Sequence, residues 1–387
     1  MRFRLGNRFY VLCGVAACSM LYSAWFLSTR TLNDLVSLSS HFETAKTFDR
    51  RLVVFGDSWS DNKTNAPEGP IWTDWLCSMF SCHQENLAAS MTSLTGKETG
   101  AVIDNKELGL VGRLSQMQVA GFDFKTQLEK WLVAEKQTLY GLSEEDLWSR
   151  QQRTIFAVSF GVWDIWDLVQ KDYDTAVASI DRRMESLLGQ LNQLSDRWGS
   201  SDIKLILTQT VDVTFLPAFE PTFSTSGTEY KESVKIIAHW NAKMRETLAS
   251  WDRGTVYLFD TNAFLLDRIR DQQFYASGIM AESGLGANTD PGWENVADGC
   301  VESMGFQVMM SKGAGEKARC EHPDKYLFWD GMTLGPSVHR LMGTEIYQGI
   351  SEAFLNQTPA GKGNLRPRNA TAGGLQLRHC DQYTGRW

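Results

Sequence analysis

Polar residues that could take part in a reaction lie next to three predicted strands or helices of the chain. Gly56-Asp57-Ser58 comes directly after the apolar run 51–55, residues 161–164 come after the run 154–159, and Asp330 precedes a helical segment. Short β-branched runs that end at glycine are typical of buried strands. In an open parallel sheet the ligand crevice lies beyond the carboxyl ends of the strands, so these polar residues are the first candidates for function.

Ser58 is the candidate nucleophile. A serine at a strand-to-helix turn presents its hydroxyl outward, and the backbone N–H groups of the turn can stabilise an oxyanion. The same position also suits a serine that only caps the next helix. Neighbouring Asp57 favours a role in fixing the turn, and Asp164 favours a helix cap over the orientation of a base.

Strand and helix patterns alternate along the chain and must position these residues. The expected strands are 51–55, 154–159, 203–208 and 255–259, and the expected helices are 72–80, 173–198, 229–251 and 336–354. Strands that alternate with helices of this length favour a parallel sheet with helices on both faces. Since no repeat and no flexible linker divides residues 45–360, we expect one α/β domain.

The first block, Val-Val-Phe-Gly-Asp-Ser-Trp-Ser-Asp-Asn at 53–62, and Phe328-Trp329-Asp330 near the end together resemble the SGNH (GDSL-type) hydrolase family. The resemblance is to its fungal secreted esterase-like members in particular and covers about residues 50–355 in element order. It implies a single three-layer, flavodoxin-like domain with a parallel sheet. It also implies an esterase site built from four sequence blocks.

The family site has a serine, a glycine, an asparagine and an aspartate three residues before a histidine. Ser58 and Asp330 match the serine and the aspartate. Gly100 resembles the second-block glycine, although the stretch that usually leads this block lies further back, at Asn86. The resemblance therefore implies Ser58 and Asp330 as catalytic residues and Gly100 as an oxyanion donor.

Two positions depart from the family pattern. Trp163 stands in place of the asparagine, and Thr333 stands in place of the histidine. Threonine has no group that titrates near neutral pH, so it cannot serve as the base. The indole N–H of Trp163 can replace the amide as an oxyanion ligand, or the ring can be plain core or pocket wall.

A substitute base must come from another histidine. His339, nine residues after the family aspartate, is the first candidate, and His322 is the second. For each, the alternative is an ordinary histidine that backbone or water satisfies. We include His339 with Ser58 and Asp330 in the expected catalytic set.

Composition and charge restrict the class of protein. The chain has 38 basic and 46 acidic side chains and a net charge of −8, which disfavours a nucleic-acid partner because no basic cluster is available to neutralise phosphates. A hydrophobic fraction of 43% fits a globular protein with a sizeable core. The 14 tryptophans, several of them near the site blocks, can form a platform for sugar rings or acyl chains, or can simply be core.

Residues 9–28 carry no charge and predict a membrane-spanning helix. Arginines precede this run, so we expect a single-pass type II protein with its folded part luminal or extracellular. The expected division is a cytosolic tip and signal-anchor helix at 1–30, a stem at 31–50, the hydrolase-like domain at 51–357 and a mobile tail at 358–387. The alternative is a cleaved signal peptide, which would release a secreted protein.

The cysteines also favour the secretory pathway. Cys77 with Cys82 and Cys300 with Cys320 are expected to form local disulfides. Zinc is the alternative, but the spacings are not those of a zinc knuckle and no histidine cluster accompanies them, so we expect no metal and no cofactor. Acceptor patterns for N-glycans agree with this location and occur at Asn62, Asn356 and Asn369.

Three functions remain open from the sequence. The first is a membrane-anchored ester hydrolase that removes an acyl group from a glycan or small ester through Ser58 and an acyl-enzyme. The second is a glycan O-acyltransferase that uses the same serine. The third is a non-catalytic binding protein of the same fold, which Thr333 and Trp163 favour. An imidazole within roughly 3–4 Å of the Ser58 hydroxyl would support catalysis.

Overall fold

The computed structural model describes most of the expected domain. The described residues are 50–62, 69–92, 98–108, 123–200, 202–222, 227–279, 290–301, 320–351 and 354. The expected membrane helix, nearly all of the stem and the expected tail lie outside these residues. Within them, no helix is both long and apolar enough to cross a bilayer.

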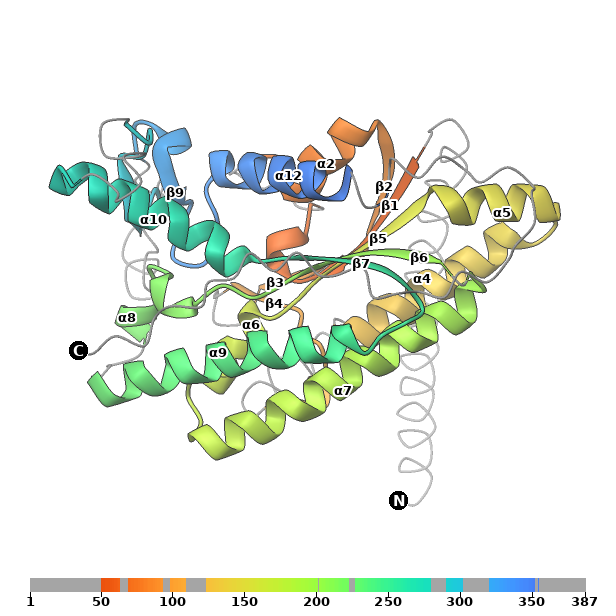
Figure 1. Ribbon diagram of the computed structural model, residues 1–387, viewed down its shortest axis with the longest axis horizontal. Helices are drawn as coiled ribbons and strands as arrows, with labels where there is room; N and C mark the ends of the chain where they lie inside the picture. Colours follow the sequence, from red (N-terminus) through yellow and green to blue (C-terminus); the bar gives the residue numbers. More distant parts are fainter. Residues whose placement is uncertain are drawn as a thin grey trace, which may run out of the picture.

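A parallel sheet of five strands forms the centre of the fold (Figure 1). Its strands are β1 (Arg50–Gly56), β2 (Cys82–Asn86), β5 (Thr154–Ser159), β6 (Ile203–Thr208) and β7 (Gly254–Phe259), in the order β2-β1-β5-β6-β7. Counted along the chain, this is the 2-1-3-4-5 order of flavodoxin-like sheets. The order reverses between β1 and β5, where Gly56 pairs with Ser159, so a ligand crevice is expected at this point.

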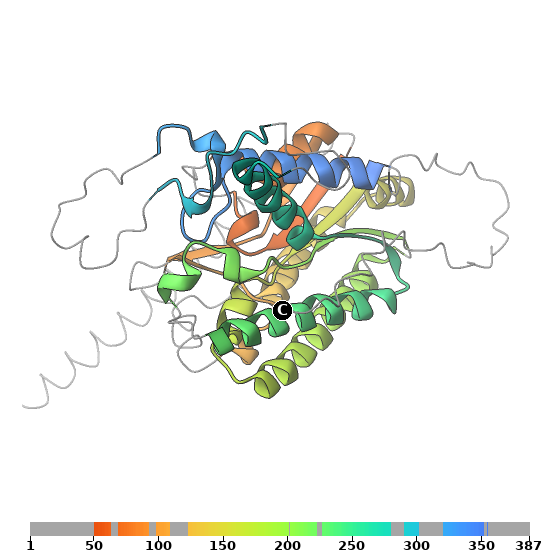
Figure 2. The same cartoon turned by 60° about the vertical axis from the view of Figure 1, so that its left-hand side comes forward.

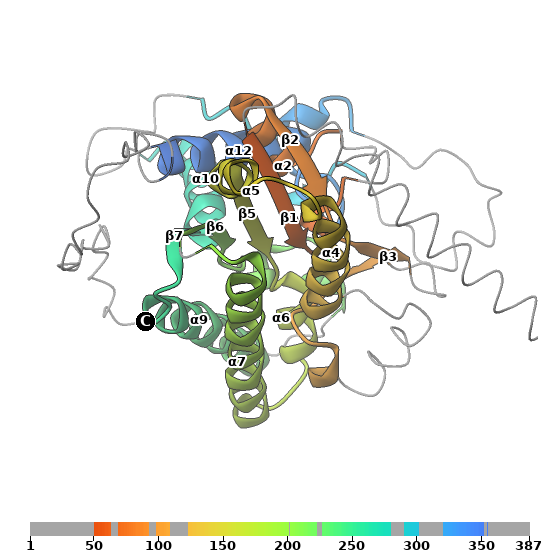
Figure 3. The ribbon, with the colours of Figure 1, turned by 90° about the vertical axis from the view of Figure 1, so that its right-hand side faces the viewer.

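Helices cover both faces of the sheet, which gives the three-layer α/β arrangement that the sequence predicts (Figures 1 and 2). One face is covered by α2 (Trp72–Phe80), α10 (Thr261–Ser277) and α12 (Pro336–Ile350). The other is covered by α4 (Phe124–Leu139), α6 (Val162–Leu168), α7 (Tyr173–Trp198) and α9 (Gly227–Ala249) (Figure 3). Helix α5 (Glu144–Arg153) leads directly into β5.

Shorter elements complete the part of the chain that is described. They are the antiparallel pair β3 (Ser90–Thr92) and β4 (Glu98–Gly100), the parallel pair β8 (Asn295–Gly299) and β9 (Tyr326–Phe328), helix α8 (Phe219–Thr222), and the 3-10 turns η2 (Ser58–Ser60), η3 (Asn105–Glu107), η4 (Val213–Phe215) and η5 (Pro323–Lys325). These elements lie in the connections and carry several of the predicted site residues.

The central strands are buried on both faces, as parallel sheets require. Every residue of β5 is buried, and so is every residue of β1 after Arg50. Aromatic side chains fill the layer between the sheet and α4, where Phe55, Phe156 and Trp131 contact one another. The apolar runs that predict strands are therefore the strands that this core requires.

The two predicted disulfides are confirmed. Cys77 and Cys82 join the end of α2 to the start of β2, with Cα atoms 5.0 Å apart. Cys300 and Cys320 lie beside β8 and β9, with Cα atoms 4.9 Å apart. Among the described side chains, no group of three His, Cys, Asp or Glu residues is arranged to hold a metal ion.

Candidate functional site at the Ser58 turn

Asp57 and Ser58 form the turn at the carboxyl end of β1. The backbone N–H of Asp57 donates to the Ser159 carbonyl at 3.0 Å, which continues the pairing of β1 with β5. The Asp57 carboxylate accepts from the Trp59 amide at 3.0 Å and is the N-cap of η2. Asp57 thus fixes the turn as expected, and the alternative in which Ser58 is itself the cap is wrong.

Trp163 and Gly100 meet at the Ser58 hydroxyl. The indole N–H of Trp163 donates to Ser58 Oγ, with the two atoms 2.9 Å apart. A Cβ placed on Gly100 would lie 2.2 Å from the Trp163 ring and 2.9 Å from the Ser58 nitrogen, so only glycine leaves room for this approach. The structure therefore brings together three of the residues singled out from sequence: Ser58, Gly100 and Trp163.

Helix α6 positions Trp163 through a strained start and a buried ion pair. Gly161 precedes the helix with φ +133°, a conformation that favours glycine. Asp164 is fully buried, lies 3.2 Å from the Arg183 guanidinium and accepts from the Ile103 amide at 3.2 Å. Because Ile103 lies three residues after Gly100, this carboxylate joins the segment of Gly100 to α6. The expectation that Asp164 caps its helix is wrong, since the N-cap is Gly161.

The Asp330 loop lies against the same turn. The Trp59 indole donates to the Met332 carbonyl at 2.7 Å. Asp330 Oδ1 accepts from the backbone amides of Met332 and Thr333, both at 2.8 Å. This carboxylate therefore stabilises its own loop. In the described part of the chain its recorded hydrogen bonds go to the backbone, and none goes to an imidazole.

Among the described residues, no histidine forms a hydrogen bond to the Ser58 hydroxyl. His339 is fully buried in α12, and neither of its ring nitrogens has a hydrogen-bond partner among the described residues. Nδ1 of His322 lies 3.0 Å from the Glu294 carboxylate, on an exposed surface. Within the described ranges, the recorded partner of Ser58 Oγ is the indole of Trp163, and no imidazole hydrogen-bonds to it. The histidines at 41 and 379 lie outside these ranges.

Burial shifts the pKa of Asp57 and Asp164, which follow β1 and β5, and the pKa of His339 in α12. It raises the pKa of Asp57 to about 8, and nearby Asp164 adds to the rise. Burial also raises the pKa of Asp164 to about 6, although the Arg183 guanidinium opposes the shift. The pKa of His339 falls to about 3 because its charged form would lose hydration. At neutral pH Asp57 is therefore mainly protonated and His339 is neutral.

The tryptophans near the site are mostly core. Trp59, Trp72 and Trp329 are buried, so these rings are not an open platform for a ligand. Trp166 is half-buried and packs edge-on against Phe219. The interpretation of these aromatics as core is therefore confirmed for the fully buried rings.

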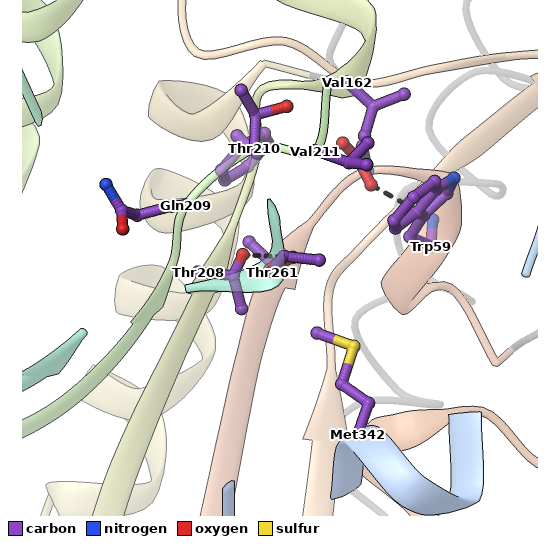
Figure 4. A pocket seen from close by; sticks show the side chains of 11 residues that line it. Trp59, Val162, Thr208, Gln209, Thr210, Val211, Thr261 and Met342 are labelled. Atoms are coloured by element: carbon purple, nitrogen blue, oxygen red, sulfur yellow. Dashed lines mark hydrogen bonds between the residues drawn. The ribbon is translucent and has the colours of Figure 1, made fainter. Parts of the chain in front are cut away.

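Sequence reasoning missed two threonines near the turn. Thr210 and Thr261 follow β6 and β7 and line a small cavity together with Asp57 (Figure 4). Both side chains are buried, and their hydroxyls have no hydrogen-bond partner among the described residues. The signal was present in the sequence, because each is a polar residue just beyond an apolar strand, as Ser58 is.

Among the described residues, the arrangement supplies hydrogen-bond donors to the Ser58 hydroxyl, and no histidine is hydrogen-bonded to it. The Trp163 indole N–H and the backbone around Gly100 and Ser58 are the kinds of group that stabilise a carbonyl or oxyanion. Deprotonation of Ser58 requires a base within hydrogen-bond reach, and Thr333 cannot be that base. No protein-family model matches the chain, and no curated protein matches it.

Proposed function

We propose that the protein is a non-catalytic relative of the SGNH hydrolases that binds the acyl carbonyl of an acylated glycan at the Ser58 turn. The observation that carries the proposal is the hydrogen bond from the Trp163 indole to Ser58 Oγ. An active serine hydrolase places an imidazole at this oxygen to take its proton. In this protein the Trp163 indole N–H donates to Ser58 Oγ, and an indole N–H cannot accept the serine proton.

The same hydrogen bond supports a binding role. Because Ser58 Oγ accepts from Trp163, its own proton is directed to another acceptor, such as a ligand carbonyl. Ser58 is half-buried, whereas Asp57 and Trp59 on either side of it are buried. Gly100 keeps the backbone close to the serine, as a carbonyl-binding site needs.

The Asp330 loop supports the loss of catalysis. In a triad the carboxylate orients the base and stabilises its charged form. Asp330 instead accepts from two backbone amides of its own loop. Thr333, at the family position of the base, follows it in that loop. Loss of a triad member usually costs several orders of magnitude in rate.

A fluorophosphonate probe tests the absence of catalysis. We expect no rapid labelling of the wild-type chain, because its serine is not activated. Thr333→His, which restores an imidazole at the family position, should label faster, and Thr333→His with Ser58→Ala should not label. Rapid labelling of the wild type that Ser58→Ala abolishes would overturn the proposal.

Calorimetry with a partly O-acetylated xylo-oligosaccharide tests the binding role, with the deacetylated oligosaccharide as the control ligand. Trp163→Phe removes the indole N–H and keeps an aromatic ring, so we expect affinity to fall about tenfold, the value of one hydrogen bond. Trp148→Phe is the matched control, because Trp148 is exposed on α5. Equal binding of the acetylated and deacetylated ligands would contradict recognition of the acyl group.

Ester hydrolysis, or acyl transfer to a glycan, is the second candidate. The convergence of Ser58, Gly100 and Trp163 favours it, since these groups would serve an oxyanion as well as a carbonyl. Labelled acyl donor with a glycan acceptor separates the two reactions, because hydrolysis yields free acid and transfer yields acylated sugar. The two disulfides are consistent with a secretory location for either function.

A further inference from the structure

A small polar cavity lies beneath the Ser58 turn. It is bordered by the ends of β1, β5 and β6 and by the first residue of α10 (Figure 4). Its volume is about 10 Å³, which is the space that one water molecule needs. Trp59 of η2, Val162 of α6 and Met342 of α12 also line it, and the volume is too small for a sugar or an acyl chain.

Two hydroxyls in the wall of this cavity lack a protein partner. Thr210 and Thr261 are each 2% exposed, and Oγ1 of each is without a hydrogen bond in the described part of the chain. Buried hydroxyls are nearly always hydrogen-bonded, to protein or to ordered water. A third hydroxyl in the wall, that of Thr208, differs because it donates to Ser159 Oγ at 2.8 Å.

Thr210 is held in place by its backbone. Asn241 of α9 accepts from the Thr210 amide at 3.2 Å and donates to the Thr210 carbonyl at 3.1 Å. On the other side, Gly161 packs so closely that an added Cβ would lie 2.9 Å from the Thr210 Cβ. These contacts hold the Thr210 backbone on two sides. The side chain of Gln209, in contrast, points away from this group and donates to the Asn241 carbonyl (Figure 4).

Thr261 is the first residue of α10 and has no capping duty there. The cap of this helix is Asp260, whose carboxylate accepts from the Ala263 amide at 2.9 Å. The Thr261 hydroxyl therefore remains available to the cavity. Asp57 forms the opposite wall, and a buried carboxyl that keeps its proton has one O–H to donate.

We propose that this cavity is a binding site for one water molecule, held by the Asp57 carboxyl and the Thr210 and Thr261 hydroxyls. The water accepts the Asp57 proton as a hydrogen bond and donates to the two threonine oxygens. Three partners are typical for a buried water. The water ties the Ser58 turn to β6 and α10, and this inference holds whether the turn binds or hydrolyses its ligand.

High-resolution crystal structures of the full chain and of two variants test the site. In the wild type we expect a water peak within hydrogen-bond distance of all three side chains. Thr210→Val with Thr261→Val replaces both hydroxyls by isosteric methyls, so the peak should be lost. Asp57→Asn keeps a donor at the same place, so the peak should remain. Absence of the peak in the wild type, or its persistence in the double valine variant, would overturn the proposal.

Nuclear magnetic resonance gives a second measurement that does not depend on crystals. The amide resonance of Ser58 should shift in Thr261→Val, because loss of the water releases the turn. Thr138→Val is the matched control, since the Thr138 hydroxyl bonds only within α4. An unshifted Ser58 amide in Thr261→Val would contradict the link between the water and the turn.

Discussion

The two ends of strand β1 hold polar clusters that are similarly buried but differ in how they are partnered. At the amino end, Arg51 and Arg150 bind Glu85 and Glu135, and none of the four is more than 8% exposed. Arg51 lies 2.6 Å from Glu85 and 3.0 Å from Glu135, and Arg150 lies 2.6 Å from Glu135. The Trp131 indole donates to Glu85 as well, at 3.0 Å. Two positive and two negative charges therefore balance.

At the carboxyl end the partners are incomplete. The pKa of Asp57 is lowered by the backbone amides of its own turn and of Val162, but by no cation. Thr210 and Thr261, just beyond β6 and β7, have hydroxyls without a hydrogen-bond partner in the described part of the chain. Burial alone thus does not distinguish a structural cluster from a site. Polar atoms without a partner do distinguish them, because nearly all buried polar groups in proteins are hydrogen-bonded and each exception needs an explanation.

The largest effect is expected from breaking the complete cluster. Arg51→Met leaves two buried carboxylates without their shared cation, so we expect a loss of about 3–5 kcal/mol in the free energy of unfolding, measured by urea denaturation. Arg270→Ala is the control, because its ion pair with Asp267 is exposed and should contribute less than about 1 kcal/mol. A small loss in Arg51→Met would mean that the cluster is not structural.

Asp57→Asn tests whether Asp57 keeps its proton in the folded protein, through the pH dependence of the free energy of unfolding. The native carboxyl keeps its proton up to about pH 8, whereas an unfolded one releases it near 3.8. The native state thus binds more protons between these values, and stability is lost as pH rises through them. Relative to the Asn variant, the wild type should lose about 3 kcal/mol between pH 5 and pH 7, at 1.36 kcal/mol per pH unit. Parallel pH profiles would show instead that Asp57 is ionised.

Gly161→Ala should lower the free energy of unfolding by less than Arg51→Met does. Its φ of +133° is strained for alanine, and the new Cβ would press on Thr210, so we expect a loss of about 1–3 kcal/mol in the free energy of unfolding. Gly189→Ala is the matched control. Gly189 lies within α7 with open space around it, so alanine there should stabilise by up to about 1 kcal/mol. Equal effects at the two glycines would contradict a close fit at the site.

His339→Leu should change stability least at pH 7, by about 1 kcal/mol or less, because the imidazole makes no hydrogen bond there. Burial holds the pKa of His339 near 3, below its ordinary 6.5. Its contribution is thus present above pH 6.5 and lost as pH falls toward 3, and the leucine variant should resist acid better in this window. If any ester turnover of the wild type vanished in His339→Leu, the role of His339 as a substitute base would return.

Most of the framework was predictable because apolar periodicity reports burial directly. The strands β5 and β6 and the helices α2 and α7 have the bounds that the sequence predicts. Strand β2, with the sequence Cys-His-Gln-Glu-Asn, was missed. It is an edge strand in which buried and half-buried residues alternate. Its buried Glu85 is stabilised by an ion pair with Arg51, so the strand lacks the apolar run that predicts burial. Helices α4, α5 and α10 were also missed.

The candidate site was predictable only in part. Strand ends pointed to Ser58 and Trp163, and the family resemblance pointed to Gly100; the structure does bring the three together. The partner of the serine could not be read from spacing, because it depends on side-chain direction across the sheet. His339, although close in sequence to Asp330, is fully buried and hydrogen-bonds to neither Asp330 nor Ser58. Nearness in sequence said nothing of the face on which its ring lies.

The hydrogen bond from Trp59 to the Met332 carbonyl spans 273 residues of sequence. During synthesis, the amino-terminal half leaves the ribosome long before the partner of this indole exists. The contacts around Ser58 can therefore form completely only late in translation, after nearly all of the domain has been synthesised. A chain that stops before β9 would leave the Trp59 indole N–H without the Met332 carbonyl.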